Sequence, residues 1–373
     1  MNRAFSNWAW LGAALALTVV ILGAYVRLSH AGLGCPDWPV CYGKATWPVT
    51  VEEVAAANRD FPERPVEVGK AWREQVHRFL AAGLGTLILG LALAASWNRR
   101  ARRNLVLATA AIAMIGVISY VQGLRDFAGM ISILAVGLPV SLAFFWRDDP
   151  RAALATGLLG LVIFQAMLGM WTVTLLLKPI VVTAHLLGGL ATLGLLVWLA
   201  MRTRERQPEH DRSLRGVAWL ALVAVAGQIF LGGWTSTNYA ALACPDLPMC
   251  QGQWWPEMDF GEAFVLWRGI GVDYEGGILD WPARTAIQFS HRLGAIALTL
   301  VLAYVLWRLS SRPRFRGHAL VIGSLLALQI GLGIWNVLGS LPLPVAVAHN
   351  AGAALLLIAV LLLFYRTTHP EPT

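Results

Sequence analysis

Four of the eight histidines fall into two pairs that repeat along the chain, and their imidazoles could bind a metal. His77 and His291 each precede an arginine, whereas His185 and His349 each follow an alanine. A flat haem needs two facing imidazoles at one depth, because its iron takes one from each side. Zinc also binds histidine, but no third or fourth ligand of suitable type stands near either pair. The pattern therefore favours haem ligation over zinc and over four separate hydrogen-bonding histidines.

Glu74 is a second candidate, because it stands three residues before His77, one helical turn away. The matching position before His291 is Gln288, so the two sites differ in charge. This difference suggests that the first site does chemistry, where an anion stabilises developing positive charge, and that the second holds a redox cofactor. The competing interpretation is that Glu74 caps the N-terminus of its helix, a favourable position for an acid.

The four cysteines form two close pairs, Cys35/Cys41 and Cys244/Cys250, which suit disulfides on an oxidising face of a membrane. A disulfide that closes so short a loop gains little from chain entropy but fixes the shape of the loop. We favour this structural role for Cys244/Cys250. For Cys35/Cys41, which is close to the helix of Glu74, a thiol-exchange role stays open as well.

The composition indicates which elements position these residues, since hydrophobic residues make up 57% of the chain and charged residues only 13%. A soluble protein carries about 25% charged residues, and disordered chains are poor in apolar ones. Nucleic acid is an unsuitable partner, because no basic patch is interleaved with aromatic residues. We therefore predict an all-α integral membrane protein in contact with lipid. Its apolar runs, each about 20 residues long, lie near 8–28, 78–97, 104–122, 128–146, 153–177, 180–201, 216–235, 285–308, 318–338 and 344–365.

The distribution of arginine predicts the orientation, because cytoplasmic junctions of membrane proteins carry an excess of basic residues. Arginines gather at alternate junctions and near both termini, which places both termini in the cytoplasm. The two long connections, 29–74 and 236–284, then lie outside with their cysteines. The junction arginines are Arg99, Arg100, Arg102, Arg103, Arg147, Arg151, Arg202, Arg204, Arg206, Arg212, Arg215, Arg308, Arg312, Arg314 and Arg316.

An internal repeat relates the two halves, since the cysteine loops and all four histidines recur in the same order and orientation. We predict two four-helix bundles, eight core helices in all, related by a pseudo-twofold axis along the membrane normal. The first comprises residues 1–101 and 151–205 and the second 206–373. The segment 102–150 has no counterpart and must cross the membrane an even number of times. We interpret it as an added helical hairpin, with a pair of interfacial helices as the alternative.

Glycines close to the histidines would let a broad macrocycle approach the helix backbone. This expectation applies to Gly188, Gly189, Gly294 and Gly352.

Together these residues resemble the haem A synthase family, in the bacterial form with cysteine pairs in both outer loops. The resemblance covers nearly the whole chain except about 102–150. Its motifs are Gly-Ala-Tyr-Val-Arg-Leu at 23–28, both Cys-Pro-Asp segments, Glu-x-x-His-Arg at 74–78, Gly-Met-Trp-Thr-Val at 169–173, Gly-Gly-Trp-Thr-Ser-Thr-Asn-Tyr at 232–239, His-Arg at 291–292 and Ala-His-Asn at 348–350.

The resemblance implies oxidation of the C8 methyl group of haem O to a formyl group, which gives haem A for cytochrome oxidase. His77 and His185 would bind the substrate haem, His291 and His349 would bind a haem b cofactor, and Glu74 would be the essential acid. The location would be the bacterial inner membrane, with the haem sites toward the periplasm. The partners compatible with this reading are lipid, haem O, a haem O synthase, an unidentified electron acceptor and a second copy of the chain.

Two other functions compete at this stage. A dihaem b electron-transfer protein linked to quinol would share the four histidines, but it needs no difference between Glu74 and Gln288. A transporter would rest on the repeat alone, and the continuous helices and the lack of buried charge argue against it.

Overall fold

The computed structural model describes residues 2–202 and 212–368, which form two compact units. Among these residues, unit 1 contains 2–26, 30–174 and 188–202, and unit 2 contains 27–29, 175–187 and 212–368. Residues 175–187, which the sequence repeat assigns to the first half, group with unit 2. The division into halves and their pseudo-twofold relation stay predictions from the repeat.

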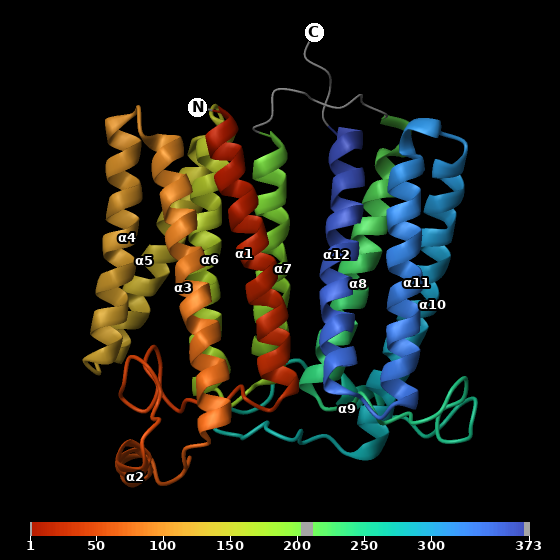
Figure 1. The fold of residues 1–373 in the computed structure, drawn as a ribbon, viewed down its shortest axis with the longest axis horizontal. Coiled ribbons are helices and arrows are strands. Elements are labelled where there is room, and N and C mark those ends of the chain that lie inside the picture. Colours follow the sequence, from red (N-terminus) through yellow and green to blue (C-terminus); the bar gives the residue numbers. More distant parts are fainter. Residues whose placement is uncertain (1, 203–211, 369–373) are drawn as a thin grey trace. The chain divides into compact units, whose positions relative to one another are not determined.

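The described chain is helical, without any strand, and ten of its helices are long and apolar enough to cross a membrane (Figure 1). Each corresponds to one of the ten predicted apolar runs, which confirms the prediction of an all-α membrane protein. The ten are α1 (Asn2–Leu28), α3 (Val68–Ser96), α4 (Arg100–Val121), α5 (Arg125–Phe145), α6 (Pro150–Thr174), α7 (Pro179–Arg202), α8 (Arg215–Thr237), α10 (Trp281–Ser310), α11 (Arg316–Leu338) and α12 (Leu343–Thr368). The short elements are α2 (Val51–Asp60), α9 (Phe260–Ala263), η1 (Arg212–Leu214) and η2 (Pro313–Phe315).

In unit 1 the inserted segment forms a hairpin of two long helices, α4 and α5, as predicted. This hairpin packs against α3 and α6, and α3 in turn packs on α6 (Figure 1). Helix α1 is attached to the second part of α7, because the Ser6 hydroxyl donates to the Ala200 carbonyl over 2.9 Å. Both α4 and α5 are membrane-spanning candidates, so the interfacial alternative is not supported.

Unit 2 contains a closed bundle in which α8 contacts α10 and α12, and α11 contacts the same two helices. Its core is an uninterrupted apolar cluster that includes Leu302, Val305 and Val360, none of them exposed. Side chains buried in this way fix the relative rotation of the four helices. The histidine positions on α10 and α12 are therefore set by the packing of the bundle.

Helix α3 begins ten residues before the apolar run at residue 78, because its first turns are polar and project beyond the apolar stretch. Its N-cap position is Glu67, whose side chain makes no capping hydrogen bond. Glu74 consequently lies inside the helix, in its second turn. Helix α10 begins more conventionally, since the carboxylate of Asp280 accepts a hydrogen bond from the Ala283 amide over 3.0 Å.

Candidate active site and haem-binding histidines

Histidines that are related by the repeat lie at matching distances along their helices. His77 and His291 are about 14 and 15 Å along α3 and α10 from the helix start, and His185 and His349 are about 9 Å along α7 and α12, at 1.5 Å per residue. All four side chains are partly buried. Histidines at equivalent positions of the sequence repeat therefore also occupy equivalent positions along their helices.

Two of these imidazole rings, those of His77 and His291, each lie against a glycine on the preceding core helix. A Cβ atom added to Gly23 of α1 would lie 3.0 Å from Cε1 of His77, and one added to Gly232 of α8 would lie 3.2 Å from Cε1 of His291. Both separations are below ordinary van der Waals contact. The Leu-Gly pairs of the two motif copies therefore let an imidazole lie against the neighbouring helix.

His291 and His349 belong to the same unit and are close enough to interact electrostatically. The described residues contain no cluster of three or more His, Cys, Asp or Glu that could hold a metal ion, so these two histidines lack the further protein ligands of a zinc site. His77 belongs to unit 1 and His185 to unit 2, so their pairing stays a prediction.

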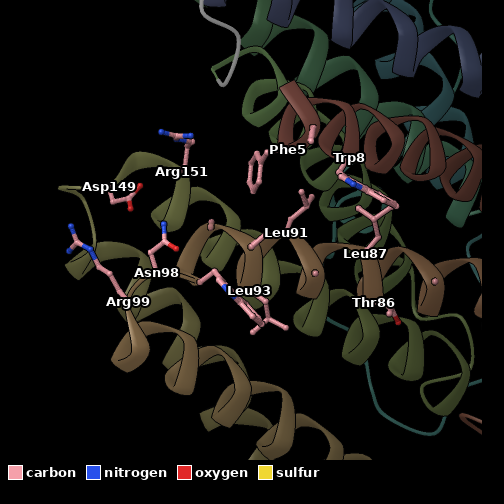
Figure 2. Close-up of a pocket in the computed structure, with 16 residues that line it drawn as sticks. Phe5, Trp8, Thr86, Leu87, Leu91, Leu93, Asn98, Arg99, Asp149 and Arg151 are labelled. Carbon is pink, nitrogen blue, oxygen red and sulfur yellow. The ribbon is translucent and has the colours of Figure 1, made fainter. Parts of the chain in front are cut away.

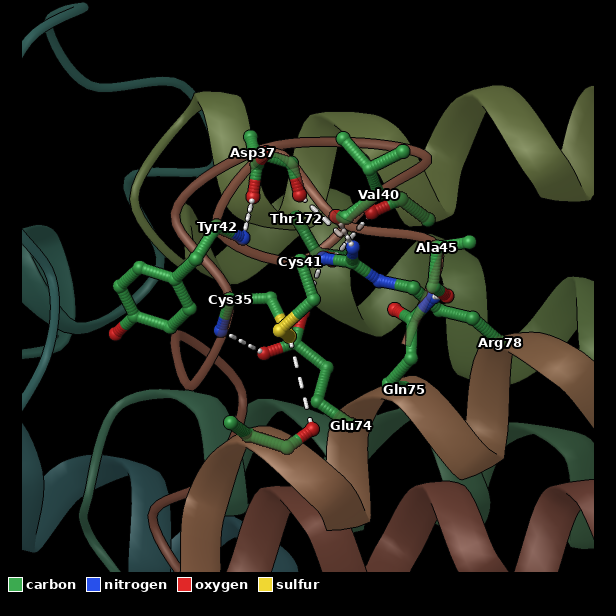
Figure 3. A network of polar contacts seen from close by, with 12 residues as sticks. Cys35, Asp37, Val40, Cys41, Tyr42, Ala45, Glu74, Gln75, Arg78 and Thr172 are labelled. Carbon is green, nitrogen blue, oxygen red and sulfur yellow. Dashed lines mark hydrogen bonds and ion pairs between the residues drawn. A yellow bond between two sulfur atoms is a disulfide. The ribbon is translucent and has the colours of Figure 1, made fainter. Parts of the chain in front are cut away.

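Glu74 is buried, with 5% of its surface exposed, and both of its carboxylate oxygens are engaged (Figure 3). Oε1 accepts from Nη2 of Arg78 over 2.6 Å, and Oε2 accepts from the backbone amide of Cys35 over 2.9 Å. The interpretation of Glu74 as a helix cap is therefore wrong, because its oxygens contact a side chain and another segment. The expected lack of buried charge is also wrong at this ion pair.

Arg78 connects the carboxylate to the first cysteine loop. Its Nη1 donates to the carbonyl oxygens of Asp37 and Val40 over 2.8 and 2.7 Å (Figure 3). The loop is closed by the Cys35–Cys41 disulfide, with both cysteines fully buried. Glu74, Arg78 and the loop therefore form one hydrogen-bonded network.

Asp37 and Tyr42 make further contacts within this loop. The Asp37 carboxylate accepts from the amides of Tyr42 and Gly43 over 2.6 and 2.7 Å, which orders the turn after Cys41. Burial, followed by the negative charges of Glu74 and Asp37, raises the pKa of the Tyr42 phenol to about 12. Tyr42 is therefore a neutral hydrogen-bond donor near neutral pH, and its hydroxyl donates to the Arg64 carbonyl over 3.2 Å.

The second cysteine loop repeats this architecture without the carboxylate. Arg292 donates to the carbonyl oxygens of Met249 and Cys244 over 2.9 and 2.6 Å, and Cys244 and Cys250 form the predicted disulfide. Asp246 accepts from two backbone amides of the following turn, which lower its pKa. Gln288 replaces Glu74 and is equally buried, but its Oε1 has no hydrogen-bond partner among the described residues.

The space beside three of the four glycines near the histidines is filled by glutamine side chains from neighbouring helices. A Cβ atom at any of these glycines would collide with a glutamine amide, whereas Gly189 instead faces Val20 at 3.7 Å. The expectation of an open gap for a macrocycle is therefore wrong at Gly188, Gly294 and Gly352. The pairs are Gln165 with Gly188, Gln228 with Gly294, and Gln329 with Gly352. Sequence reasoning missed the glutamines, although Gln165 and Gln329 stand in matching repeat motifs.

A cavity of about 950 Å³ in unit 1 lies elsewhere, along the C-terminal half of α3 between Gly83 and Ala95 (Figure 2). It is lined by α1 and α3, including Trp8 and Trp97, with Arg99 and Arg151 also in its wall. Neither Glu74 nor His77 lines it. This cavity is therefore separate from the candidate active site.

Comparison with known proteins agrees with the geometry. A family model described as a cytochrome oxidase assembly protein, COX15-CtaA, matches residues 6–124 and 123–361. The chain belongs to this family. Since the matched ranges include the hairpin, the COX15-CtaA assignment extends to almost all of the membrane-spanning helices.

Three curated bacterial relatives, each named haem A synthase, match nearly end to end. The protein of Shewanella oneidensis is 40% identical over 357 residues, covering 95% of this chain and 93% of the relative. The protein of Caulobacter vibrioides is 26% identical, and the match covers 99% of this chain and 97% of the relative. The protein of Rhizorhabdus wittichii is also 26% identical, and the match covers 96% of this chain and 92% of the relative. With its ten candidate spans, this COX15-CtaA member is a multi-pass bacterial membrane protein.

Proposed function

We propose that this protein is a haem A synthase, which oxidises the C8 methyl group of haem O to a formyl group and supplies haem A for cytochrome oxidase. The relatives that match almost end to end carry this name. The observation that carries the proposal is the buried Glu74 carboxylate, one helical turn from His77 and fixed by Arg78 and Cys35. The matching position in the other half holds the neutral Gln288.

His77 and His185 are the proposed ligands of the substrate haem, and His291 and His349 those of haem b. Support comes from the matching helix positions of the repeat-related histidines and from the glycines that contact the rings of His77 and His291. The amide of Gln228 contacts the His291 ring through Nε2, and its Oε1 lacks a partner; this also fits an iron ligand, because a ligating imidazole carries a proton on its other nitrogen and can donate to such an oxygen. When bound, haem b supplies one-electron transfer to an external acceptor.

The reaction converts a methyl group and one water molecule to a formyl group, with release of four electrons and four protons. Two successive oxidations, each followed by addition of water, lead to a hydrated aldehyde that then loses water. Positive charge develops at the methyl carbon as electrons leave the substrate haem. Glu74 is suited to stabilise that charge, because its carboxylate is already oriented before the reaction and shielded from water.

Analysis of the extracted porphyrins tests the function directly. Mass spectrometry of the purified full-length protein should find haem O or haem A together with haem b. Two haem b molecules and no haem O or haem A would instead identify the dihaem electron-transfer protein.

Substitution of Glu74 tests the site. Glu74→Gln should keep the bound haem and lose haem A production, because the amide preserves the shape of the side chain but not its charge. The matched control is Glu53→Gln, which removes a carboxylate of the same outer loop that is paired with Lys44 instead. Normal haem A output from Glu74→Gln would refute the assignment.

The proposed location is the bacterial inner membrane, with both termini in the cytoplasm and the haem sites toward the periplasm. The arginines at alternate junctions and the disulfides in both cysteine loops support this orientation. A haem O synthase, an electron acceptor and a second copy of the chain are the proposed protein partners. Reporter fusions after Ser96 and after Gly123 should report opposite sides, cytoplasmic and periplasmic respectively. The reverse result would refute the orientation.

A further inference from the structure

Three of the four candidate haem ligands share a short sequence pattern, His-x-x-Gly. It occurs at His185–Gly188, His291–Gly294 and His349–Gly352, whereas the fourth site reads His77-Arg78-Phe79-Leu80. In a helix, residues three apart lie on the same face, so each glycine leaves a gap on the face that carries the histidine. In all three cases a glutamine from a neighbouring helix occupies that gap.

At His291 the glutamine makes direct contact with the ring. Nε2 of Gln228 lies 3.1 Å from Nδ1 of His291 and donates to the His291 backbone carbonyl over 3.0 Å. A Cβ atom at Gly294 would collide with Oε1 of Gln228 and would lie 2.7 Å from a methyl group of Leu231. Glycine at position 294 is therefore needed for the amide to reach the imidazole.

The other end of the same amide lacks a partner. Oε1 of Gln228 is buried and accepts no hydrogen bond from the described residues. A buried acceptor without a partner is unfavourable, so a donor is expected beside it in the working protein. An imidazole that binds iron through Nε2 carries its proton on Nδ1 and is that donor once the amide rotates its oxygen toward the ring, which exchanges the bond from Nε2 to the His291 carbonyl for a bond from Nδ1–H to Oε1.

We propose that Gln228 is a positioning residue of the haem b site, which holds His291 through Nδ1 and tunes its electron donation to the iron. This inference rests on the proposed role of His291 as a haem b ligand. A hydrogen bond from Nδ1–H to an acceptor makes the imidazole a stronger donor, which stabilises the ferric state. The repeat places Val19 and Leu80 where the second half has Gln228 and Gly294, so this amide distinguishes the second site from the first.

Redox titration of haem b in the purified full-length protein tests the inference, with Gln228→Leu and Gln228→Glu as opposing variants. Gln228→Leu removes the acceptor and should shift the reduction equilibrium about tenfold toward the ferrous state, equivalent to about +59 mV for one electron. Gln228→Glu provides a stronger acceptor and should shift the potential in the opposite direction. Thr299→Val is the control, since it removes a polar group of the helix that carries His291, whose hydroxyl donates to the Ala295 carbonyl instead of contacting a candidate ligand, and it should shift the potential less than threefold.

Shifts of opposite sign for the two variants support the proposal, because a packing role would move both in the same direction. Shifts of equal sign would overturn it, as would a Thr299→Val effect as large as that of Gln228→Leu, or loss of haem b from both Gln228 variants with the fold retained. A wild-type protein without haem b would refute the haem assignment itself. Wild-type haem b with unshifted variants would refute the role of Gln228 alone.

Discussion

The internal repeat allows the ion pair of Glu74 and Arg78 to be measured against a built-in reference. Arg78→Leu removes one bond to the Glu74 carboxylate and two to loop carbonyls, whereas Arg292→Leu removes two loop-carbonyl bonds of similar length and no carboxylate bond. The difference in destabilisation between the two variants therefore isolates the carboxylate. The cost of losing the arginine-to-carbonyl hydrogen bonds is similar in both variants and cancels when their destabilisations are subtracted.

The expected difference follows from burial. The side chains of Arg78 and Glu74 are only 12% and 6% exposed, so removal of the arginine leaves a buried charge with backbone donors alone, the amides of Cys35 and Gly34. Breaking a buried ion pair from one side costs about 3–5 kcal/mol. Arg78→Leu should therefore lower the free energy of unfolding by about 3–5 kcal/mol more than Arg292→Leu does.

A double variant identifies the cause. If the stranded carboxylate is responsible, Glu74→Gln should restore about 2–3 kcal/mol in the Arg78→Leu background, because the charge that lost its partner is then absent. The assay is reversible unfolding by SDS in mixed micelles, followed by tryptophan fluorescence. Equal destabilisation by Arg78→Leu and Arg292→Leu, or no recovery with Glu74→Gln, would refute the reasoning.

Two further predictions concern the glycines that contact the imidazole rings, Gly23 and Gly232, and Glu53 in the first outer loop. Gly23→Leu should abolish binding of the substrate haem and spare haem b, and Gly232→Leu should do the reverse, because each side chain would enter the space of one imidazole. Pyridine haemochrome spectra measure both haems. Loss of both haems from either variant would contradict the pairing. The pKa of Glu53 is lowered to about 2, first by its hydrogen bond to Lys44 and then by backbone amides, so its contribution to loop stability is present above the ordinary glutamate pKa and is lost as the pH falls toward 2. Hydrogen exchange in α2 should accelerate over that pH range, and Glu53→Gln should remove this pH dependence; an unchanged profile in the variant would show that another group is responsible.

Hydropathy was sufficient to predict the ten helices, because a membrane requires long apolar runs whatever their partners. It misplaced the start of α3, since a helix continues into water where apolar content no longer marks it. That error made a capping role for Glu74 plausible. The correct environment depends on Cys35, which is 39 residues distant in sequence and reaches the carboxylate only through the fold of the loop.

The glutamine contacts show a different limit of sequence reasoning. Each His-x-x-Gly pattern is visible along the chain, but the residue that fills the gap comes from another helix. Its identity depends on which helices are neighbours and how they are rotated, and both are decided by packing of the whole bundle. A glycine beside a candidate ligand is therefore ambiguous in sequence, because it can admit a cofactor or a protein side chain.

The two cysteine loops share their disulfide, their acidic turn and an arginine bonded to loop carbonyls. Features present in both loops cannot explain why the two sites would perform different tasks, so we assign them to holding the loops on the helices. Two of the differences between the halves lie next to the histidines: a carboxylate in one half where the other has an amide, and Gln228 in the second half where the first has Val19. A duplicated scaffold can thus acquire a reactive site and an electron-transfer site by substitutions beside the ligands, without a change in the ligands themselves.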